Sequence, residues 1–159
     1  MPRPSFVVPT LVASLLLAPV PAFAQEQAPA ADTAGPLGAI DALFAAMSTH
    51  DVAAVRKLLL PGAKFLVVRA DGTTHVSDDT GFLDTLGKDT KSAWQERIWS
   101  PQVRVDGPMA QVWAPYDFHL DGKFSHCGVD VVTLVQGKDG WQIAAIAYTG
   151  RKDNCPPGG

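Results

Sequence analysis

Apolar residues early in the sequence recur at helical spacing and later alternate as in strands. Between residues 37 and 49 they lie three or four positions apart, which predicts an amphipathic helix. Asp51 can cap a second helix, whose apolar residues run from Val52 to Leu59 and which the pair Pro61-Gly62 is expected to end. Two helices, almost head to tail, are therefore expected first.

Asp-Gly pairs divide the remaining sequence, and this dipeptide favours tight hairpin turns because both residues tolerate positive φ. The first pair, at 71–72, predicts a hairpin between Lys64–Arg69 and Thr73–Ser77, and a short helix is expected after Ser77. Three further pairs separate four predicted strands, at about 94–105, 109–120, 123–136 and 141–150. These strands form an antiparallel meander.

Helices followed by a meander predict an α+β domain in which the helices pack on one face of the sheet. A cone-shaped, curved antiparallel sheet wrapped around N-terminal helices leaves a conical cavity, which suits a small ligand. The predicted domain covers residues 37–155.

The N-terminus has the pattern of a secretory signal peptide at residues 1–24. Arg3 is its one charge, an apolar stretch follows at Leu11–Ala18, and Ala22-Phe23-Ala24 is a small-x-small cleavage site. That stretch is too short to span a bilayer, so no membrane attachment is expected after cleavage. Export is predicted, to the periplasm or out of the cell, with residues 25–36 as a flexible lead-in and residues 156–159 as a tail.

Composition excludes two further classes of protein. The 159 residues hold 13 Lys+Arg and 16 Asp+Glu, so there is no basic surplus for a nucleic-acid backbone. With 47% hydrophobic and 18% charged residues, the chain is not disordered, and its length fits one domain.

The two cysteines, Cys127 and Cys155, lie in the predicted mature chain. An even count in an oxidising compartment favours a disulfide that ties the tail to a strand, and the alternative is a buried thiol at Cys127 with a free thiol in the tail. The histidines are scattered, and neither a phosphate-binding loop nor a nucleophile motif occurs. No metal and no cofactor are therefore expected.

The order of predicted elements, together with several sequence stretches, resembles the nuclear transport factor 2-like superfamily, in particular an uncharacterised exported branch that is SnoaL-like or ketosteroid isomerase-like. The resemblance covers about residues 37–155. It is carried by the stretches Trp113-Ala-Pro-Tyr116-Asp-Phe, Gly122-Lys-Phe-Ser-His126-Cys127-Gly-Val-Asp130, Asp139-Gly-Trp141-Gln-Ile143 and Tyr148-Thr-Gly-Arg-Lys-Asp-Asn-Cys155. The superfamily includes isomerases, dehydratases and cyclases as well as members without known activity, so the resemblance implies the fold and leaves the chemistry open.

His126 is the first candidate for catalysis, because an imidazole titrates near neutrality and can accept or donate a proton. A two-residue turn at 121–122 places it opposite Asp117, with Cβ atoms about 5 Å apart. Such a pair can transfer a proton, or it can be a structural ion pair or part of an interface. Both side chains point to the convex face if the apolar face containing Tyr116 is concave, whereas a bulge at Pro115 would turn His126 into the cavity.

Five further residues are candidates for ligand binding. Aromatic side chains can stack on a flat ligand, although in strands they also serve the core or an interface, and a carboxylate can pair with a polar group or stay solvated. These candidates are Trp99, Trp113, Tyr116, Asp130 and Tyr148.

Three functional hypotheses remain open. The first is an exported domain, expected to be a homodimer, that binds a small, partly apolar molecule. The second is a proton-transfer enzyme of isomerase, dehydratase or cyclase type that uses His126 and Asp117. The third is a structural or dimerisation domain whose cavity is filled by side chains.

Overall fold

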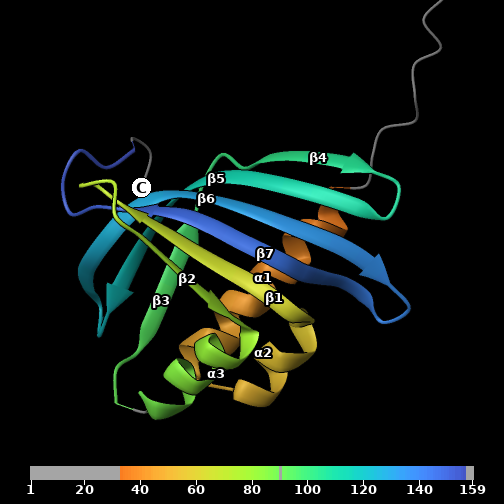
Figure 1. Ribbon diagram of the computed structural model, residues 1–159, viewed down its shortest axis with the longest axis horizontal. Helices are drawn as coiled ribbons and strands as arrows, with labels where there is room; N and C mark the ends of the chain where they lie inside the picture. The colour runs from red at the N-terminus through yellow and green to blue at the C-terminus, as the bar shows by residue number, and fades with distance from the viewer. Residues whose placement is uncertain (1–32, 90, 157–159) are drawn as a thin grey trace, which may run out of the picture.

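The computed structural model describes residues 33–89 and 91–156. Within them, three helices pack on one face of a curved seven-stranded sheet (Figure 1). The helices are α1 (Ala34–Ser48), α2 (Val52–Leu58) and α3 (Asp79–Lys88). The predicted α+β class is thereby confirmed, with a curved and unclosed sheet.

Carboxylate caps fix where the last two helices begin. The Ala54 N–H donates to Asp51 Oδ1 at 2.9 Å, and the Gly81 N–H donates to Asp78 Oδ1 at 3.0 Å. Each bond satisfies a backbone donor that lacks a partner within its helix.

The strands follow the order β2-β1-β7-β6-β5-β3, and β4 pairs with the other half of β5. Neighbouring strands are antiparallel, except that β1 and β7 run parallel. Their bounds are β1 (Leu59–Arg69), β2 (Thr74–Asp78), β3 (Trp94–Ile98), β4 (Gln102–Asp106), β5 (Met109–Leu120), β6 (Lys123–Gly137) and β7 (Gly140–Gly150). The hairpin and the meander predicted from the Asp-Gly pairs are both present.

Three element boundaries differ from the prediction. Helix α1 begins at Ala34, inside the predicted lead-in. The pair Pro61-Gly62 does not end α2, but lies within β1 where the register against β7 shifts. The predicted strand 94–105 is two strands, because Ser100 has φ 46° and the following proline cannot donate to a ladder.

The predicted signal peptide lies outside the described residues, as does most of the predicted tail. Within the described part, no helix is long and apolar enough to cross a membrane.

One inserted residue in the β5–β6 hairpin decides which side chains face the helices. At the turn, Asp121 and Gly122 both have positive φ, and Leu120 pairs with Lys123. The register then shifts by one residue, so that Phe118 pairs with His126 and Ser125 is the extra residue of a bulge. Every residue of β6 beyond Ser125 is consequently turned to the opposite face.

His50 ties the joint between α1 and α2 to the segment that follows α3. Its Nδ1 lies 3.0 Å from Leu86 O and its Nε2 lies 2.6 Å from Ser92 O. A carbonyl oxygen only accepts, so both contacts are hydrogen bonds only when both ring nitrogens carry protons. The bonds to Ser92 and Leu86, with a smaller contribution from nearby Asp89, raise the pKa of His50 above its usual value.

We expect this contact to stabilise the fold most at acid pH. Since the folded-state pKa is raised, the contribution is full below about pH 6.5 and is lost as the pH rises through the folded-state pKa. His50→Asn tests this, because asparagine tolerates the φ of 54° at this position. Urea unfolding across this pH range should show that the variant loses about 1–2 kcal/mol at acid pH and much less at alkaline pH. An equal loss at every pH would contradict the prediction.

Candidate functional site

A cavity of about 580 Å³ lies between the helices and the concave face of the sheet. Helix α1 and helix α3 form one side of it, and side chains of β1, β2, β3, β5, β6 and β7 form the other. The alternation of side chains along β5 explains which of its residues reach the cavity. Tyr116, Phe118 and Leu120 point into it, and the residues between them face away. The alternation predicted for this strand therefore builds the wall of a cavity.

Aromatic rings make up much of the wall. The rings of Phe65 and Phe82 stack with their centroids 4.3 Å apart. Trp94 and Phe118 meet edge to face with centroids 5.8 Å apart, and Tyr116 and Tyr148 do so at 6.1 Å. These rings offer a small molecule a largely apolar surface.

A pair of carboxyl groups lies among these rings. Glu96 lines the cavity, and its side chain is hydrogen-bonded to that of Asp130, which is 3% exposed. Burial raises the pKa of Asp130 to about 7. Burial and the neighbouring carboxyl group together raise the pKa of Glu96 well above its usual value. At neutral pH the pair therefore holds a proton that one carboxyl group can donate while the other accepts.

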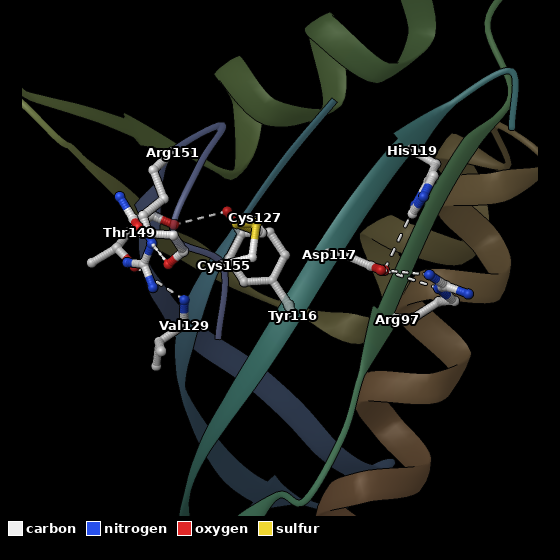
Figure 2. Close-up of a disulfide and its surroundings, with 10 residues drawn as sticks. Arg97, Tyr116, Asp117, His119, Cys127, Val129, Thr149, Arg151 and Cys155 are labelled. Atoms are coloured by element: carbon white, nitrogen blue, oxygen red, sulfur yellow. Dashed lines mark hydrogen bonds and ion pairs between the residues drawn. A yellow bond between two sulfur atoms is a disulfide. The ribbon is translucent and has the colours of Figure 1, made fainter. Parts of the chain in front are cut away.

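Two tyrosines stand beside this carboxyl pair. Tyr148 is the register partner of Asp130 on the neighbouring strand. The Tyr116 hydroxyl donates to the carbonyl oxygen of Thr149 at 2.9 Å (Figure 2). Burial, and to a lesser degree the nearby carboxyl groups, raises the pKa of both tyrosines, so both hydroxyl groups stay protonated at neutral pH.

His126 also lines the cavity, because the bulge at Ser125 turns it inward. Its Nδ1 lies 3.1 Å from the Ser125 hydroxyl, and its ring lies 5.0 Å from that of Phe118, centroid to centroid. Burial lowers the pKa of His126, and the charge of Lys152 lowers it further. The imidazole is therefore neutral at neutral pH.

The predicted pairing of Asp117 with His126 is wrong. Asp117 lies opposite Cys127 across the hairpin, on the face of β5 that points away from Tyr116. Arg97, its register partner on β3, donates to both carboxylate oxygens, with Nε 2.9 Å from Oδ1 (Figure 2). The predicted two-residue turn is present, but the bulge beyond it breaks the predicted register.

The predicted aromatic residues divide into two groups. Tyr116 and Tyr148 line the cavity, as the ligand-binding prediction requires. Trp113 does not, because it lies on the outer face of β5 and is 42% exposed. Trp99 follows the end of β3, where its backbone N–H donates to Pro115 O, and it is not among the residues that line the cavity.

Sequence reasoning missed Glu96. A signal for it exists, since Glu96 stands between Trp94 and Ile98 at the inward positions of an alternating strand. A carboxyl group at a core-facing position requires a partner, and here that partner is Asp130.

The disulfide Cys127–Cys155 is present, with a Cα–Cα distance of 5.7 Å. Cys127 is also held to Arg151 by backbone hydrogen bonds of 2.9 and 3.0 Å in the two directions. The disulfide thus attaches the tail to β6 (Figure 2). The same strand carries His126 and Asp130.

The described residues contain no cluster of three or more His, Cys, Asp or Glu side chains that could hold a metal ion. The polar side chains that line the cavity carry carboxyl, hydroxyl and imidazole groups.

We expect Asp130→Asn to flatten the dependence of stability on pH. A raised carboxyl pKa means that the folded state binds more protons than the unfolded state, so stability falls as the pH rises from about 4 to 7. An amide keeps a hydrogen bond to Glu96 and cannot ionise, so the variant should gain about 2 kcal/mol relative to wild type across this window. Urea unfolding measures this, with Asp106→Asn at the exposed end of β4 as control. A decline as steep as that of wild type would contradict the prediction.

Comparison with models of protein families shows which family the chain belongs to. A family described as the SnoaL-like domain matches residues 37–148. The chain belongs to this family. Comparison with curated proteins found no similar sequence.

Solved structures show the same fold at low sequence identity. A putative dehydratase of the NTF2-like family from Streptomyces avermitilis is 15% identical, with a TM-score of 0.60 over 75% of this chain and 95% of that one. An NTF2-like protein with a cystatin-like fold from Novosphingobium aromaticivorans is 14% identical, with a TM-score of 0.60 over 76% and 82%. An NTF2-like superfamily protein from Salmonella enterica is 16% identical, with a TM-score of 0.58 over 77% and 92%. These similarities confirm the NTF2-like fold of the SnoaL-like domain.

Proposed function

We propose that this SnoaL-like domain binds a small, partly apolar molecule in the cavity between its helices and sheet. The observation that carries the proposal is the buried Glu96–Asp130 carboxyl pair, which gives an aromatic-rich cavity of about 580 Å³ a carboxyl group to orient a ligand. The open space argues against a purely structural domain whose cavity is filled by side chains.

Native mass spectrometry of the protein purified from its own exported fraction tests this proposal. An extra mass that is present on the folded protein and lost on denaturation is the expected result. Phe118→Trp, which adds volume to the wall of the cavity, should reduce the bound fraction. A bound fraction that Phe118→Trp leaves unchanged, or no extra mass at all, would count against binding in this cavity.

A second function, proton transfer, is favoured by the same carboxyl pair. One carboxyl group can take a proton from a carbon next to a carbonyl group while the other donates a hydrogen bond to the carbonyl oxygen. The structure supports this pair as the acid and base, in place of the predicted pair of His126 and Asp117. The similarity to a putative dehydratase agrees with such chemistry.

Hydrogen–deuterium exchange of small ketones in D2O, followed by proton NMR, tests this second function. Wild type should speed the loss of the α-proton signals, and Glu96→Gln should abolish the acceleration. His126→Gln is the comparison, because it changes another polar wall residue and leaves the carboxyl pair intact. If exchange stops in His126→Gln and continues in Glu96→Gln, the acid–base assignment is wrong.

We also propose that the chain is exported. The N-terminal pattern and the disulfide support export, since such bonds persist in oxidising compartments. N-terminal sequencing of the protein from cell fractions should give a chain that begins at Gln25. A chain that retains Met1 in the cytoplasm would refute export.

Dimerisation through the outer face of the sheet is proposed as well. Met109 and Trp113 on this face are 53% and 42% exposed, which supports an apolar contact between two copies. Light scattering should give twice the monomer mass for wild type and the monomer mass for Trp113→Arg. A monomeric wild type would refute this proposal.

A further inference from the structure

Negative charge collects in the cavity. Asp89 and Glu96 both line it, and Asp130 is hydrogen-bonded to Glu96. Asp89 accepts a hydrogen bond from Trp94 Nε1 at 2.9 Å, and this bond, together with backbone donors, holds the pKa of Asp89 at about 2. The Asp89 carboxylate is therefore ionised at neutral pH, and the carboxyl pair adds further negative charge whenever it loses its proton.

Basic side chains are placed unevenly around these acids. His50 lies near Asp89, which raises the pKa of that imidazole, but none of the described residues that line the cavity is a lysine or arginine. Basic residues do act on other wall groups. Arg69 and Arg151 offset part of the rise in the pKa of Tyr148 and of Tyr116, and Lys152 helps to lower the pKa of His126. The causes that set the pKa of Glu96 and Asp130 include no basic group. A buried carboxyl pair without a counter-charge is costly, and a cationic ligand would remove that cost.

The aromatic wall suits the same kind of ligand. Trp94 lies beside the ionised Asp89, and Phe118 and Tyr148 line the cavity near the carboxyl pair. The faces of aromatic rings attract a desolvated cation, by about 0.5–2 kcal/mol for each well-placed ring. Aromatic rings and carboxylates together discriminate against an anion and favour an ammonium group on an apolar body.

We infer that the ligand of this cavity is a small organic cation, a protonated amine carried on an aromatic or apolar body. This inference rests on the proposed binding function and names its ligand class. An ammonium group next to Glu96 and Asp130 favours the doubly ionised pair. The O–H bond of the protonated carboxyl group then breaks and its proton passes to the buffer, while no other bond changes.

Three probes of similar shape test the inference: 2-phenylethylamine, 2-phenylethanol and phenylacetate, which are cationic, neutral and anionic at neutral pH. Isothermal titration calorimetry on the disulfide-bonded chain should show the amine binding about tenfold or more tighter than the alcohol, with phenylacetate weakest. Titrations in phosphate and in Tris, whose ionisation enthalpies differ, should show proton release with the amine and none with the alcohol.

Two variants separate the cavity from the overall negative charge of the protein. Glu96→Gln should reduce the preference for the amine over the alcohol by about fivefold or more and abolish the proton release, while the ionised Asp89 retains a weaker preference for the amine. Asp106→Asn removes one charge at the exposed end of β4 and should leave both effects intact. Thermal unfolding of each variant verifies that it is folded.

Each remaining outcome decides against the inference. If the alcohol binds wild type as tightly as the amine does, the ligand class is not cationic, although the proposal of binding in the cavity still holds. Tighter binding of phenylacetate refutes the inference in the same way. If none of the probes binds, the inference also fails, and the native mass measurement shows separately whether the binding function fails with it.

Discussion

Gly128→Ala should cost the fold about 4 kcal/mol, from overpacking together with the loss of a buried hydrogen bond. A Cβ atom at this position would lie 1.8 Å from the carbonyl oxygen of Thr149, far inside contact distance. That oxygen accepts the hydroxyl hydrogen bond of Tyr116, so its displacement would also leave a buried hydroxyl group without its partner. Backbone at the end of the β6–β7 pair, next to the Asp130–Tyr148 register pair, would have to move.

The local hydrogen bonding explains why this oxygen is so close. The Thr149 carbonyl bonds to Tyr116, and the Val129 N–H instead donates to Thr149 Oγ1 at 3.0 Å. A threonine hydroxyl thus replaces a rung of the ladder, and glycine at position 128 leaves room for the displaced carbonyl. The run His126-Cys127-Gly128 therefore places one residue in the cavity, one in the disulfide and one beneath the Tyr116 contact.

Gly150→Ala is the matched control for this substitution. A Cβ at Gly150 would meet its nearest atoms at 3.7 and 3.9 Å, which is ordinary contact, and alanine is favoured over glycine within a strand. Urea unfolding of both variants is the measurement. Gly150→Ala should be as stable as wild type or slightly more stable. Equal stability of the two variants would show that the close approach at Gly128 does not constrain the fold.

The local signals in the sequence predicted much of this fold. The Asp-Gly pairs mark the hairpins because their backbone preferences act within two residues. Alternation along residues 109–120 placed the apolar side chains of β5 on one face, since a strand has a period of two, and in the structure that face lines the cavity. The parallel pairing of β1 with β7 has no such local signal, because these strands are far apart in the sequence.

The site was harder to predict because it depends on one residue and on curvature. Ser125 shifts the register by one position, so that His126 points inward. Asp117 then pairs with Arg97 and not with His126. Curvature of the sheet brings Glu96 on β3 to Asp130 on β6, although β5 lies between these strands. The sequence predicts that both carboxyl groups lie on strands, but its local patterns do not predict how strongly the sheet curves.

Loss of the disulfide is the other large effect that we expect. Cys155→Ser leaves the buried Cys127 side chain in place and removes only the cross-link between residues 28 positions apart. A loop of this length restricts the unfolded chain by about 3.5 kcal/mol in the chain-entropy account. Urea unfolding of the variant should show a loss of that size, and wild type in reductant should lose a similar amount.

The backbone contacts predict how this loss is distributed. The mutual hydrogen bonds of Cys127 and Arg151 do not depend on the sulfur atoms, so the end of β7 should stay paired in the variant. Hydrogen exchange should therefore quicken at residues 152–155 and stay slow at Asp130 and Tyr148, which pair deeper in the sheet. A variant within about 1 kcal/mol of wild type would mean that the unfolded chain is already compact around this loop, because the cross-link would then remove little of its freedom. Fast exchange at Asp130 would instead mean that the cross-link stabilises the pairing of β6 with β7 at Asp130 as well as the tail.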